Sequence, residues 1–389
     1  MNLILFDDAQ RDHLLPFVFT RPCADIRIGI CTLREKWEQL LAVSSSTLTL
    51  PYLSEKYPVL TGDDNLYING RLLPDEELLK SIHSLKLNEQ LMQENRVLAA
   101  KSVKAELKLN ADWNLERVKY NGKAALINNT WDIFKWNDAA IRSDFERMTH
   151  GRKSITADET NRLLSPGNIF IEEGAKVSCS VINASAGPVY IDAGAEVMEG
   201  CLIRGPFALG EHAVLKMGAK VYGATTIGAG SKVGGEINNS VIFGNSNKAH
   251  DGFLGNSVIG EWCNLGADTN NSNLKNNYSE VKVWDYVAND YVKTGLQFCG
   301  LMMGDHSKCG INTMFNTGTV AGICANIFGA GFPPKFIPSF YWGDASDGET
   351  FKIDKAIELA RIVYQRRGKM ADEKEENILR HLFKQLQGK

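Results

Sequence analysis

Residues 191–233 read IDAGAEVMEGCLIRGPFALGEHAVLKMGAKVYGATTIGAGSKV, and an aliphatic residue recurs at every sixth position of this stretch. The recurring residues are Ile191, Val197, Ile203, Leu209, Leu215, Val221, Ile227 and Val233. Neither an α-helix nor an alternating strand sustains a period of six. A solenoid with three short strands in each coil does, because each flat side contributes one inward aliphatic side chain and each corner takes a small residue. The stretch therefore predicts a hexapeptide-repeat β-helix.

The same spacing returns further along the chain, at Met303, Cys309, Phe315, Ala321 and Ile327. The two runs together predict an all-β domain over residues 165–340, a left-handed parallel β-helix, which is a known exception to right-handed crossovers. Between them the period slips over residues 234–258, and residues 268–278 form a polar, Asn-rich stretch. Insertions in a solenoid form outer loops that often lie over the binding face. We therefore expect the chemistry where the repeat is interrupted.

Residues 1–136 have the pattern of a mixed α/β domain. Residues 3–6 and 66–68 read as strands, and residues 126–127 as a further short strand. Residues 33–41 have helical spacing, and Pro74 followed by three acidic residues indicates the start of a second helix. This order of elements predicts an open, Rossmann-like α/β sheet.

Two further segments flank the β-helix. Residues 137–164 are polar and helix-prone, which predicts a helical linker that ends at the Ser-Pro-Gly sequence beginning at Ser165. Residues 341–389 form a C-terminal extension with a helix-like stretch at 351–386. This helix could cap the coil, pack on a neighbouring subunit or lie alone on the surface.

Composition excludes several classes of partner. A net charge of −3 gives no reason to expect a basic face for nucleic acid. The first apolar run has four residues and is followed by Asp7 and Asp8, which is neither a signal peptide nor a membrane span. The eight cysteines form no C-x-x-C pair, so we expect reduced thiols and a cytoplasmic location.

The segment at 248–255 (KAHDGFLG), followed by NLGADT at 264–269, carries a more specific pattern than the repeat. It resembles the acetyltransferase domain of the bifunctional N-acetylglucosamine-1-phosphate uridyltransferase / glucosamine-1-phosphate N-acetyltransferase family. The stretches TRP at 20–22 and ADIRIGI at 24–30 resemble a divergent bacterial branch of the sugar nucleotidyltransferases. The resemblance implies small-molecule substrates, acetyl-CoA as co-substrate, and a homotrimer with sites between subunits.

The resemblance assigns roles to four residues of the β-helix. His250 stands where the family has its general base, and an imidazole titrates near working pH. Asn264 and Asn273 match family residues that position the sugar or assist the base. Lys216 stands where the family has an Arg that contacts substrate phosphate; Lys keeps the charge without the bidentate fork. Phe253 and Leu274 replace two family tyrosines, which leaves the identity of the acetyl acceptor open.

The nucleotidyltransferase signature is incomplete in the first domain. The family has a Gly-rich loop ending in Arg, whose N–H groups and cations hold nucleotide phosphates. Residues 6–11 (FDDAQR) occupy that place without glycine. Arg11 and Arg21 remain as candidate phosphate ligands, and the acids Asp7 and Asp8 could hold Mg²⁺. The family's metal-binding Asp is also missing after the 66–68 strand, so the sequence does not identify the metal ligands.

Three hypotheses follow. The leading one is acetylation of glucosamine 1-phosphate with acetyl-CoA, followed by uridylyl transfer from UTP to give UDP-N-acetylglucosamine. The second keeps the β-helix acyltransferase but lets the first domain only bind a nucleotide or sugar phosphate. The third is a non-catalytic trimeric scaffold, which would have no need of His250 and Asn264.

Overall fold

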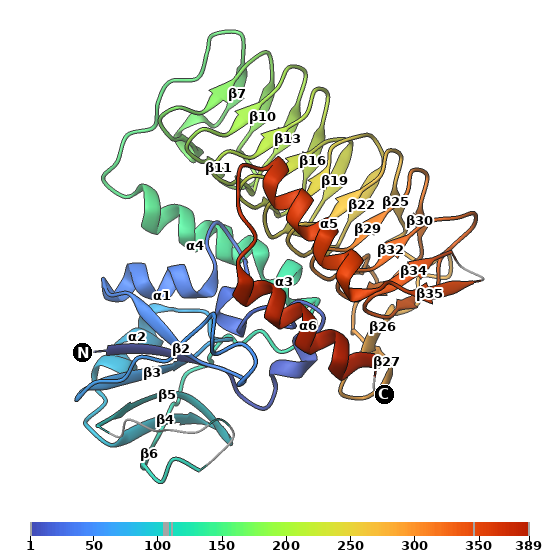
Figure 1. The fold of residues 1–389 in the computed structure, drawn as a ribbon. Coiled ribbons are helices and arrows are strands. Elements are labelled where there is room, and N and C mark those ends of the chain that lie inside the picture. Colours follow the sequence, from blue (N-terminus) through green and yellow to red (C-terminus); the bar gives the residue numbers. More distant parts are fainter. Residues whose placement is uncertain (1, 104–108, 110–111, 345–346, 388–389) are drawn as a thin grey trace.

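The computed structural model describes residues 2–103, 109, 112–344 and 347–387. Figure 1 shows an α/β domain below a long solenoid, with a pair of C-terminal helices running across both. The predicted order of an α/β domain, a β-helix and a helical C-terminus is confirmed.

The first domain is built on one six-stranded sheet in the order β2-β1-β3-β5-β4-β6. Strand β1 pairs in parallel with β2 and β3, whereas β5 runs antiparallel to β3 and β4. The strands are β1 (Asn2–Phe6), β2 (Ser45–Leu48), β3 (Asn65–Asn69), β4 (Glu89–Gln93), β5 (Arg96–Ser102) and β6 (Glu116–Lys119). The two strands predicted at 3–6 and 66–68 are therefore confirmed as β1 and β3.

Both predicted helices of this domain are present and capped. Helix α1 (Leu33–Leu41) begins at a capping box in which Thr32 and Glu35 bond each other's backbone N–H. Helix α2 (Glu76–His83) begins after Asp75, whose carboxylate accepts from the backbone N–H of Leu78. The strand predicted at 126–127 is wrong. Leu126 makes an isolated antiparallel bridge to Leu72, with backbone hydrogen bonds from Leu73 N to Ala125 O and from Ile127 N to Arg71 O, and no strand extends from it.

The segment that links the domains is helical over only its first part. The short helix α3 (Asp132–Lys135) leads into α4 (Asn137–Thr149), which ends two residues before Gly151 at a φ of +72°. Residues 150–161 have no regular structure, and the first β-helix strand begins at Arg162. The expected helical linker thus gives way to extended chain well before residue 164.

The β-helix is a three-sided prism of parallel strands. Side A contains β7 (Arg162–Leu164), β10 (Val181–Asn183), β13 (Leu202–Arg204), β16 (Lys220–Tyr222), β19 (Glu236–Asn238) and β22 (Phe253–Gly255). Side B contains β8 (Ile169–Ile171), β11 (Val189–Ile191), β14 (Phe207–Leu209), β17 (Thr225–Ile227), β20 (Val241–Ile242), β23 (Val258–Ile259), β28 (Met302–Met303), β31 (Val320–Ala321) and β33 (Phe336–Ile337).

Side C contains β9 (Lys176–Val177), β12 (Glu196–Val197), β15 (Val214–Leu215), β18 (Lys232–Val233), β21 (Asn247–Lys248), β24 (Asn264–Leu265), β29 (Lys308–Cys309), β32 (Asn326–Ile327) and β34 (Tyr341–Gly343). An antiparallel strand, β35 (Gly348–Thr350), closes the end of this side. Beyond β22, side A continues through β25 (Asn270–Asn271) and β30 (Met314–Phe315).

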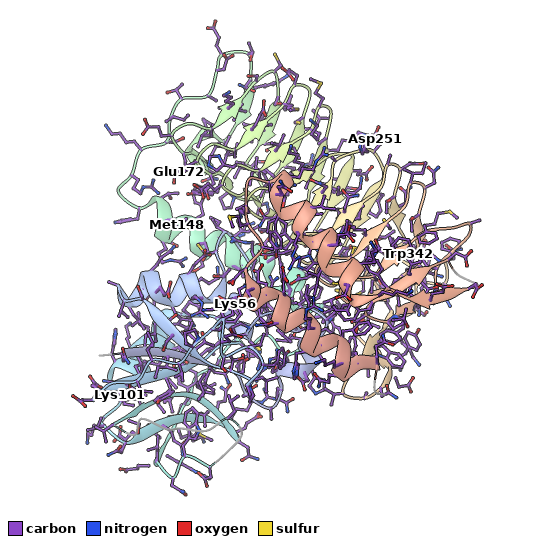
Figure 2. All side chains as sticks on the ribbon, viewed as in Figure 1. Lys56, Lys101, Met148, Glu172, Asp251 and Trp342 are labelled. Carbon is purple, nitrogen blue, oxygen red and sulfur yellow. The ribbon has the colours of Figure 1, made fainter. Side chains whose placement is uncertain are left out.

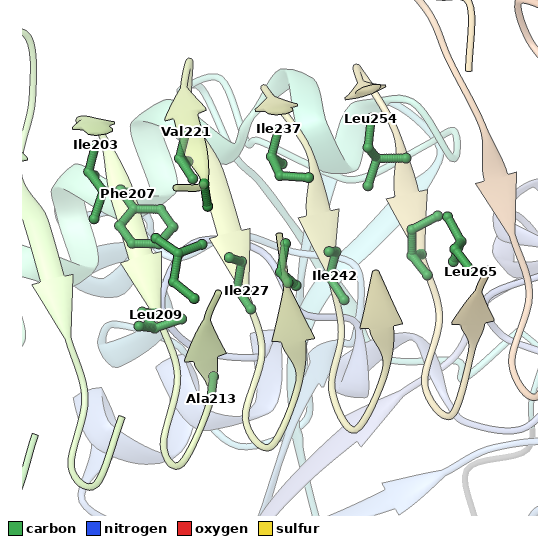
Figure 3. Close-up of a cluster of buried hydrophobic side chains, with 14 of the residues drawn as sticks. Ile203, Phe207, Leu209, Ala213, Val221, Ile227, Ile237, Ile242, Leu254 and Leu265 are labelled. Carbon is green, nitrogen blue, oxygen red and sulfur yellow. The ribbon is translucent and has the colours of Figure 1, made fainter. Parts of the chain in front are cut away.

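The residues at period six form the core of the prism. All eight of the first run and all five of the second lie in one buried hydrophobic cluster. Figure 3 shows side chains from successive coils stacked inside the solenoid. The register explains the stack, because Leu215 pairs with Val233 and Leu209 with Ile227 on neighbouring strands. Each such aliphatic side chain contributes about 1.5–3 kcal/mol by leaving water.

The insertion between β25 and β28 leaves the three sides of the prism. It folds into the hairpin β26 (Lys282–Asp285) and β27 (Asp290–Lys293) and packs on the first domain. Val281 and Val283 join the same core cluster as Phe17. His13 Nδ1 lies 2.8 Å from Asp285 Oδ2. Apolar residues behind the Asn-rich stretch are thus buried against the first domain, and the expectation of a loop over the binding face stays a prediction.

The first domain and the C-terminal helices cover two parts of the prism. The first domain packs on side B, where the rings of Phe17 and Phe243 lie 5.4 Å apart. Helix α5 (Ile353–Arg366) lies against the edge between sides B and C, with the ring of Tyr364 4.1 Å from that of Trp262. Helix α6 (Glu373–Gln387) packs between the last coils and the first domain. The predicted C-terminal helix is therefore two helices that join the domains.

Candidate functional site

The turns that follow the strands of side C form one edge of the prism, here termed the C/A edge. They comprise residues 198–201, 216–219, 234–235, 249–252, 266–269 and 310–313. Backbone hydrogen bonds stack these turns: Asp268 N donates to Asp251 O at 3.1 Å, and Asn312 N donates to Ala267 O at 2.8 Å. Figure 2 shows Asp251 on the outer side of the solenoid.

Two of the sequence-predicted residues, Lys216 and His250, lie on this edge in turns that the 234–235 turn separates. A Cβ at Gly234 would lie 3.1 Å from Lys216 Cβ on one side and 2.7 Å from Ala249 O on the other. Lys216 and the turn that carries His250 therefore flank one small turn. The His250 side chain is exposed, and Lys216 is half-buried. The arrangement places a cation and an imidazole on one solvent-facing line.

Asn264 and Asn273 lie on different sides of the prism. Asn264 is exposed on side C, two residues before the next turn of the C/A edge, and its Oδ1 accepts from Asn247 Nδ2 at 3.3 Å. Arg367 Nη2 in turn donates to Asn247 Oδ1 at 2.8 Å. Asn273 lies at the far end of side A, where its Nδ2 donates to Asn256 Oδ1 at 2.8 Å. One chain thus brings Asn264 near the His250 edge but leaves Asn273 at the opposite edge of side A.

Part of the Asn-rich stretch proves to hold the coil together. Asn270 Oδ1 accepts from Phe253 N at 2.7 Å, and Asn271 Oδ1 accepts from Gly255 N at 2.9 Å. Asn271 Nδ2 also donates to Gly255 O at 3.1 Å. These side-chain hydrogen bonds take the place of backbone hydrogen bonds between β22 and the following strand. They therefore satisfy backbone N–H and C=O groups of β22. Sequence reasoning read the stretch as a loop and missed this role.

Lys248 is a further residue that sequence reasoning missed. It is 2% exposed and occupies an inward position of side C. Its Nζ donates to the carbonyls of His250 and Asp251, the turn of the candidate base. The signal was available, because Ile242, Lys248 and Leu254 keep the spacing of six.

The arginines proposed as phosphate ligands are enclosed. Arg11 Nε lies 3.1 Å from Asp7 Oδ2, and both side chains are buried. Arg21 forms an ion pair with Asp305 across 284 residues and lies 3.5 Å from Glu261. Their role as phosphate ligands stays a prediction, which this geometry does not favour because protein carboxylates already hold both guanidinium groups.

The carboxyl end of the parallel strands is filled by another ion pair. Arg71, fully buried, donates from Nε to Asp8 Oδ1 at 2.9 Å, and Asn69 Nδ2 donates to Asp8 Oδ2 at 2.8 Å. Burial alone would raise the pKa of Asp8, but the Arg71 guanidinium outweighs it and the pKa is lowered. Because Asp7 and Asp8 are neutralised by arginines, this donor set does not fit Mg²⁺. Within the described ranges, no group of three His, Cys, Asp or Glu side chains could hold a metal.

A solvent-facing polar edge on a parallel β-helix, joined to an α/β domain, defines a two-domain protein of the hexapeptide-repeat class. Residues 3–153 match the sugar nucleotidyl transferase family. This match covers the first domain, and parts of the chain are similar to proteins described as bifunctional sugar-1-phosphate nucleotidylyltransferase/acetyltransferases.

Two archaeal relatives show the extent of the similarity. The bifunctional protein GlmU of Methanococcus aeolicus is 28% identical over 211 residues, covering 54% of this chain and 44% of that protein. The bifunctional sugar-1-phosphate nucleotidylyltransferase/acetyltransferase of Sulfurisphaera tokodaii is 30% identical over 244 residues, covering 62% of this chain and 52% of that protein. The chain spans about half the length of these curated relatives.

The similarity to one solved structure is weak. The Arabidopsis UDP-N-acetylglucosamine acyltransferase is similar over 53% of this chain and 75% of its own, at 13% identity and a TM-score of 0.22, which is too low to carry an argument. In the part of the chain that the structure describes, no helix has the length and apolar character needed to cross a bilayer.

Proposed function

We propose that the chain is an enzyme of sugar-nucleotide biosynthesis that transfers an acetyl group from acetyl-CoA to the amine of glucosamine 1-phosphate on the C/A edge. The observation that carries this proposal is the placement of His250 and Lys216 on one exposed edge, with Asn264 beside it. The names of the relatives, which include sugar-1-phosphate nucleotidylyltransferase and acetyltransferase, support the same class of reaction.

The chemistry needs a base, an anchor for the phosphate and alignment of both substrates. The exposed His250 imidazole would accept the proton that the sugar ammonium must lose before its nitrogen attacks the thioester carbon. The Lys216 ammonium would hold the phosphate, and Asn264 would orient the acceptor. Exposed apolar side chains on the same edge, Met217 and Ile311, offer contacts for the pantetheine arm of acetyl-CoA.

For the first domain we propose uridylyl transfer from UTP, to give UDP-N-acetylglucosamine. A specific observation favours the alternative, in which this domain only binds a nucleotide or sugar phosphate. The Asp8–Arg71 pair occupies the carboxyl end of the parallel strands, where ligands of open α/β sheets bind. Catalysis there would require the Asp8–Arg71 ion pair to open.

We further propose a homotrimer formed through side A. The first domain covers side B, and α5 covers the edge between sides B and C. Side A keeps exposed apolar side chains, among them Leu202 and Tyr222, at 51% and 37% exposure. A second copy packed on side A would also bring an Asn273 toward a His250 edge, which one chain alone does not do. A cytoplasmic location stays a prediction, supported by free thiols at all eight cysteines.

A paired assay on the full chain tests the proposal. Thiol release from acetyl-CoA is measured with glucosamine 1-phosphate, and pyrophosphate release from UTP is measured with the acetylated sugar. His250→Ala should lower the rate of thiol release by about 100-fold, the contribution expected of a positioned general base. The matched control is His212→Ala, because His212 is an exposed histidine on another edge of the prism.

The two assays test acetyl transfer and uridylyl transfer independently. Thiol release that is unchanged in His250→Ala would refute the base assignment. Absence of thiol release with every amino-sugar phosphate would refute acetyl transfer itself. Pyrophosphate release at a measurable rate would instead refute the alternative of a binding-only first domain.

A further inference from the structure

Lys248 interrupts the aliphatic line inside the β-helix. On side C it pairs in register with Val233, and Leu265 occupies the same inward place on the following strand. Both neighbours belong to the hydrophobic core of the prism. A lysine at 2% exposure among aliphatic side chains has lost its water shell, and its ammonium must find partners inside the protein.

The Lys248 ammonium donates hydrogen bonds to three backbone carbonyls at the C/A edge. Its Nζ donates to Asp251 O at 2.9 Å, to Gly234 O at 3.3 Å and to His250 O. An ammonium has three N–H donors, so these contacts use all of them. Two of the three carbonyls belong to the turn at 249–252, which carries the candidate base.

Neighbouring turns of this edge satisfy their carbonyls in a different way. Thr269 Oγ1 donates to Gly266 O at 2.7 Å, and Thr313 Oγ1 donates to Gly310 O at 2.9 Å. The fourth position of the 249–252 turn is Gly252, at a φ of +115°. A Cβ there would lie 2.2 Å from Thr269 O, so this turn has no room for a threonine. The turn is therefore held from inside the prism by Lys248.

We propose that Lys248 is a positioning residue that sets the direction in which the His250 side chain leaves the C/A edge. Its ammonium holds the carbonyls of residues 250 and 251 toward the prism interior. Because each peptide is planar, fixing a carbonyl restricts the backbone on both sides of it and hence the Cα–Cβ direction of His250. Lys248 itself is buried and does not reach the substrate. The inference rests on the proposed role of His250 as the base.

The placement of a lysine here is not explained by packing. Burial lowers the pKa of Lys248 to about 8, although the charges of Asp251, Cys309 and Asp268 act in the opposite direction. An aliphatic residue at this place would avoid that unfavourable desolvation. The hydrogen bonds from the Lys248 ammonium to the carbonyls of the turn offset this desolvation.

Lys248→Met tests the proposal, because methionine keeps an unbranched side chain of similar size and removes all three donors. The kcat for thiol release should fall by about 10- to 100-fold, the effect of a displaced catalytic group. The KM for acetyl-CoA should stay within about threefold, since a positioning loss acts on the chemical step.

Lys232→Met is the matched control, because Lys232 lies one coil earlier on the exposed face of side C. It should leave kcat and KM unchanged. An unchanged kcat in Lys248→Met would overturn the proposal. So would a KM for acetyl-CoA that rises more than about threefold, because Lys248 would then act on binding and not on the chemical step.

Hydrogen–deuterium exchange on the full chain decides the matter without activity. In Lys248→Met, exchange should accelerate in the turn at 249–252 and at Asp268, whose N–H donates to Asp251 O. The turn at 310–313 has its own threonine contact and should not change. If the wild type releases no thiol, the proposed function fails while this measurement still stands. Unchanged protection of the 249–252 turn would overturn the proposal whatever the activity.

Discussion

His306 makes the junction of the β-helix, the first domain and the C-terminal helices sensitive to acid. The residue is 8% exposed, and its ring lies 5.9 Å from that of Tyr364 on α5. Its Nδ1 has no hydrogen-bond partner among the described residues. Burial lowers the pKa of His306 to about 3, and the nearby Lys308 acts in the same direction. The folded chain therefore holds a neutral imidazole at this junction.

The sign and size of the effect follow from linkage. Below the usual His pKa of about 6.5, the unfolded chain binds a proton that the folded chain refuses. His306 therefore does not reduce the free energy of unfolding above about pH 6.5. Below that pH the free energy of unfolding decreases, and it continues to decrease as the pH falls toward about 3. Each pH unit removes about 1.4 kcal/mol, so about 2 kcal/mol is lost at pH 5. His306→Asn removes this titration, and asparagine tolerates the left-handed backbone at φ +61°.

Unfolding by urea, followed by near-ultraviolet circular dichroism at about pH 7.5 and about pH 5, measures the difference. The other charged groups that line this junction, among them Arg21, Lys56 and Glu261, are present in wild type and variant alike, so their own titrations cancel. His212→Asn is the control, because His212 has the same left-handed backbone at φ +54° but a side chain that is 73% exposed. Acidification should cost the wild type and His212→Asn about 2 kcal/mol more than His306→Asn. An equal loss in all three proteins would refute the reasoning.

Three further outcomes are expected. Gly228→Ala places a Cβ 1.4 Å from Phe243 O and should lower the free energy of unfolding by about 3 kcal/mol in urea melts, whereas Gly167→Ala, which meets nothing, should be neutral. Leu202→Glu on side A should leave a monomer by light scattering; an unchanged mass would contradict self-association through that side. Lys216→Gln should raise the KM for the sugar phosphate by about tenfold at nearly constant kcat, and an unchanged KM would remove Lys216 from the phosphate site.

The β-helix core was predictable residue by residue, whereas much of the site was not. A period of six makes every inward position a count along the chain, and Ile191 and Val233 at its two ends are both buried as counted. The same count includes Lys248, but a lysine in that place could be interpreted only once its carbonyl partners were known. His250 was found by resemblance, and its position on an exposed edge beside Lys216 follows from how the coils stack.

The sequence by itself determined the solenoid, because each hexapeptide decides locally which side chain points inward and which residues turn the corner. It also determined α1 and α2, whose caps lie within three residues of the helices they begin. Only the tertiary structure decided what surrounds the solenoid. Arg21 meets Asp305 across 284 residues, and the hairpin after the Asn-rich stretch packs on the first domain. Such contacts depend on which surfaces remain apolar or charged after each unit has folded, and no spacing within one segment records that.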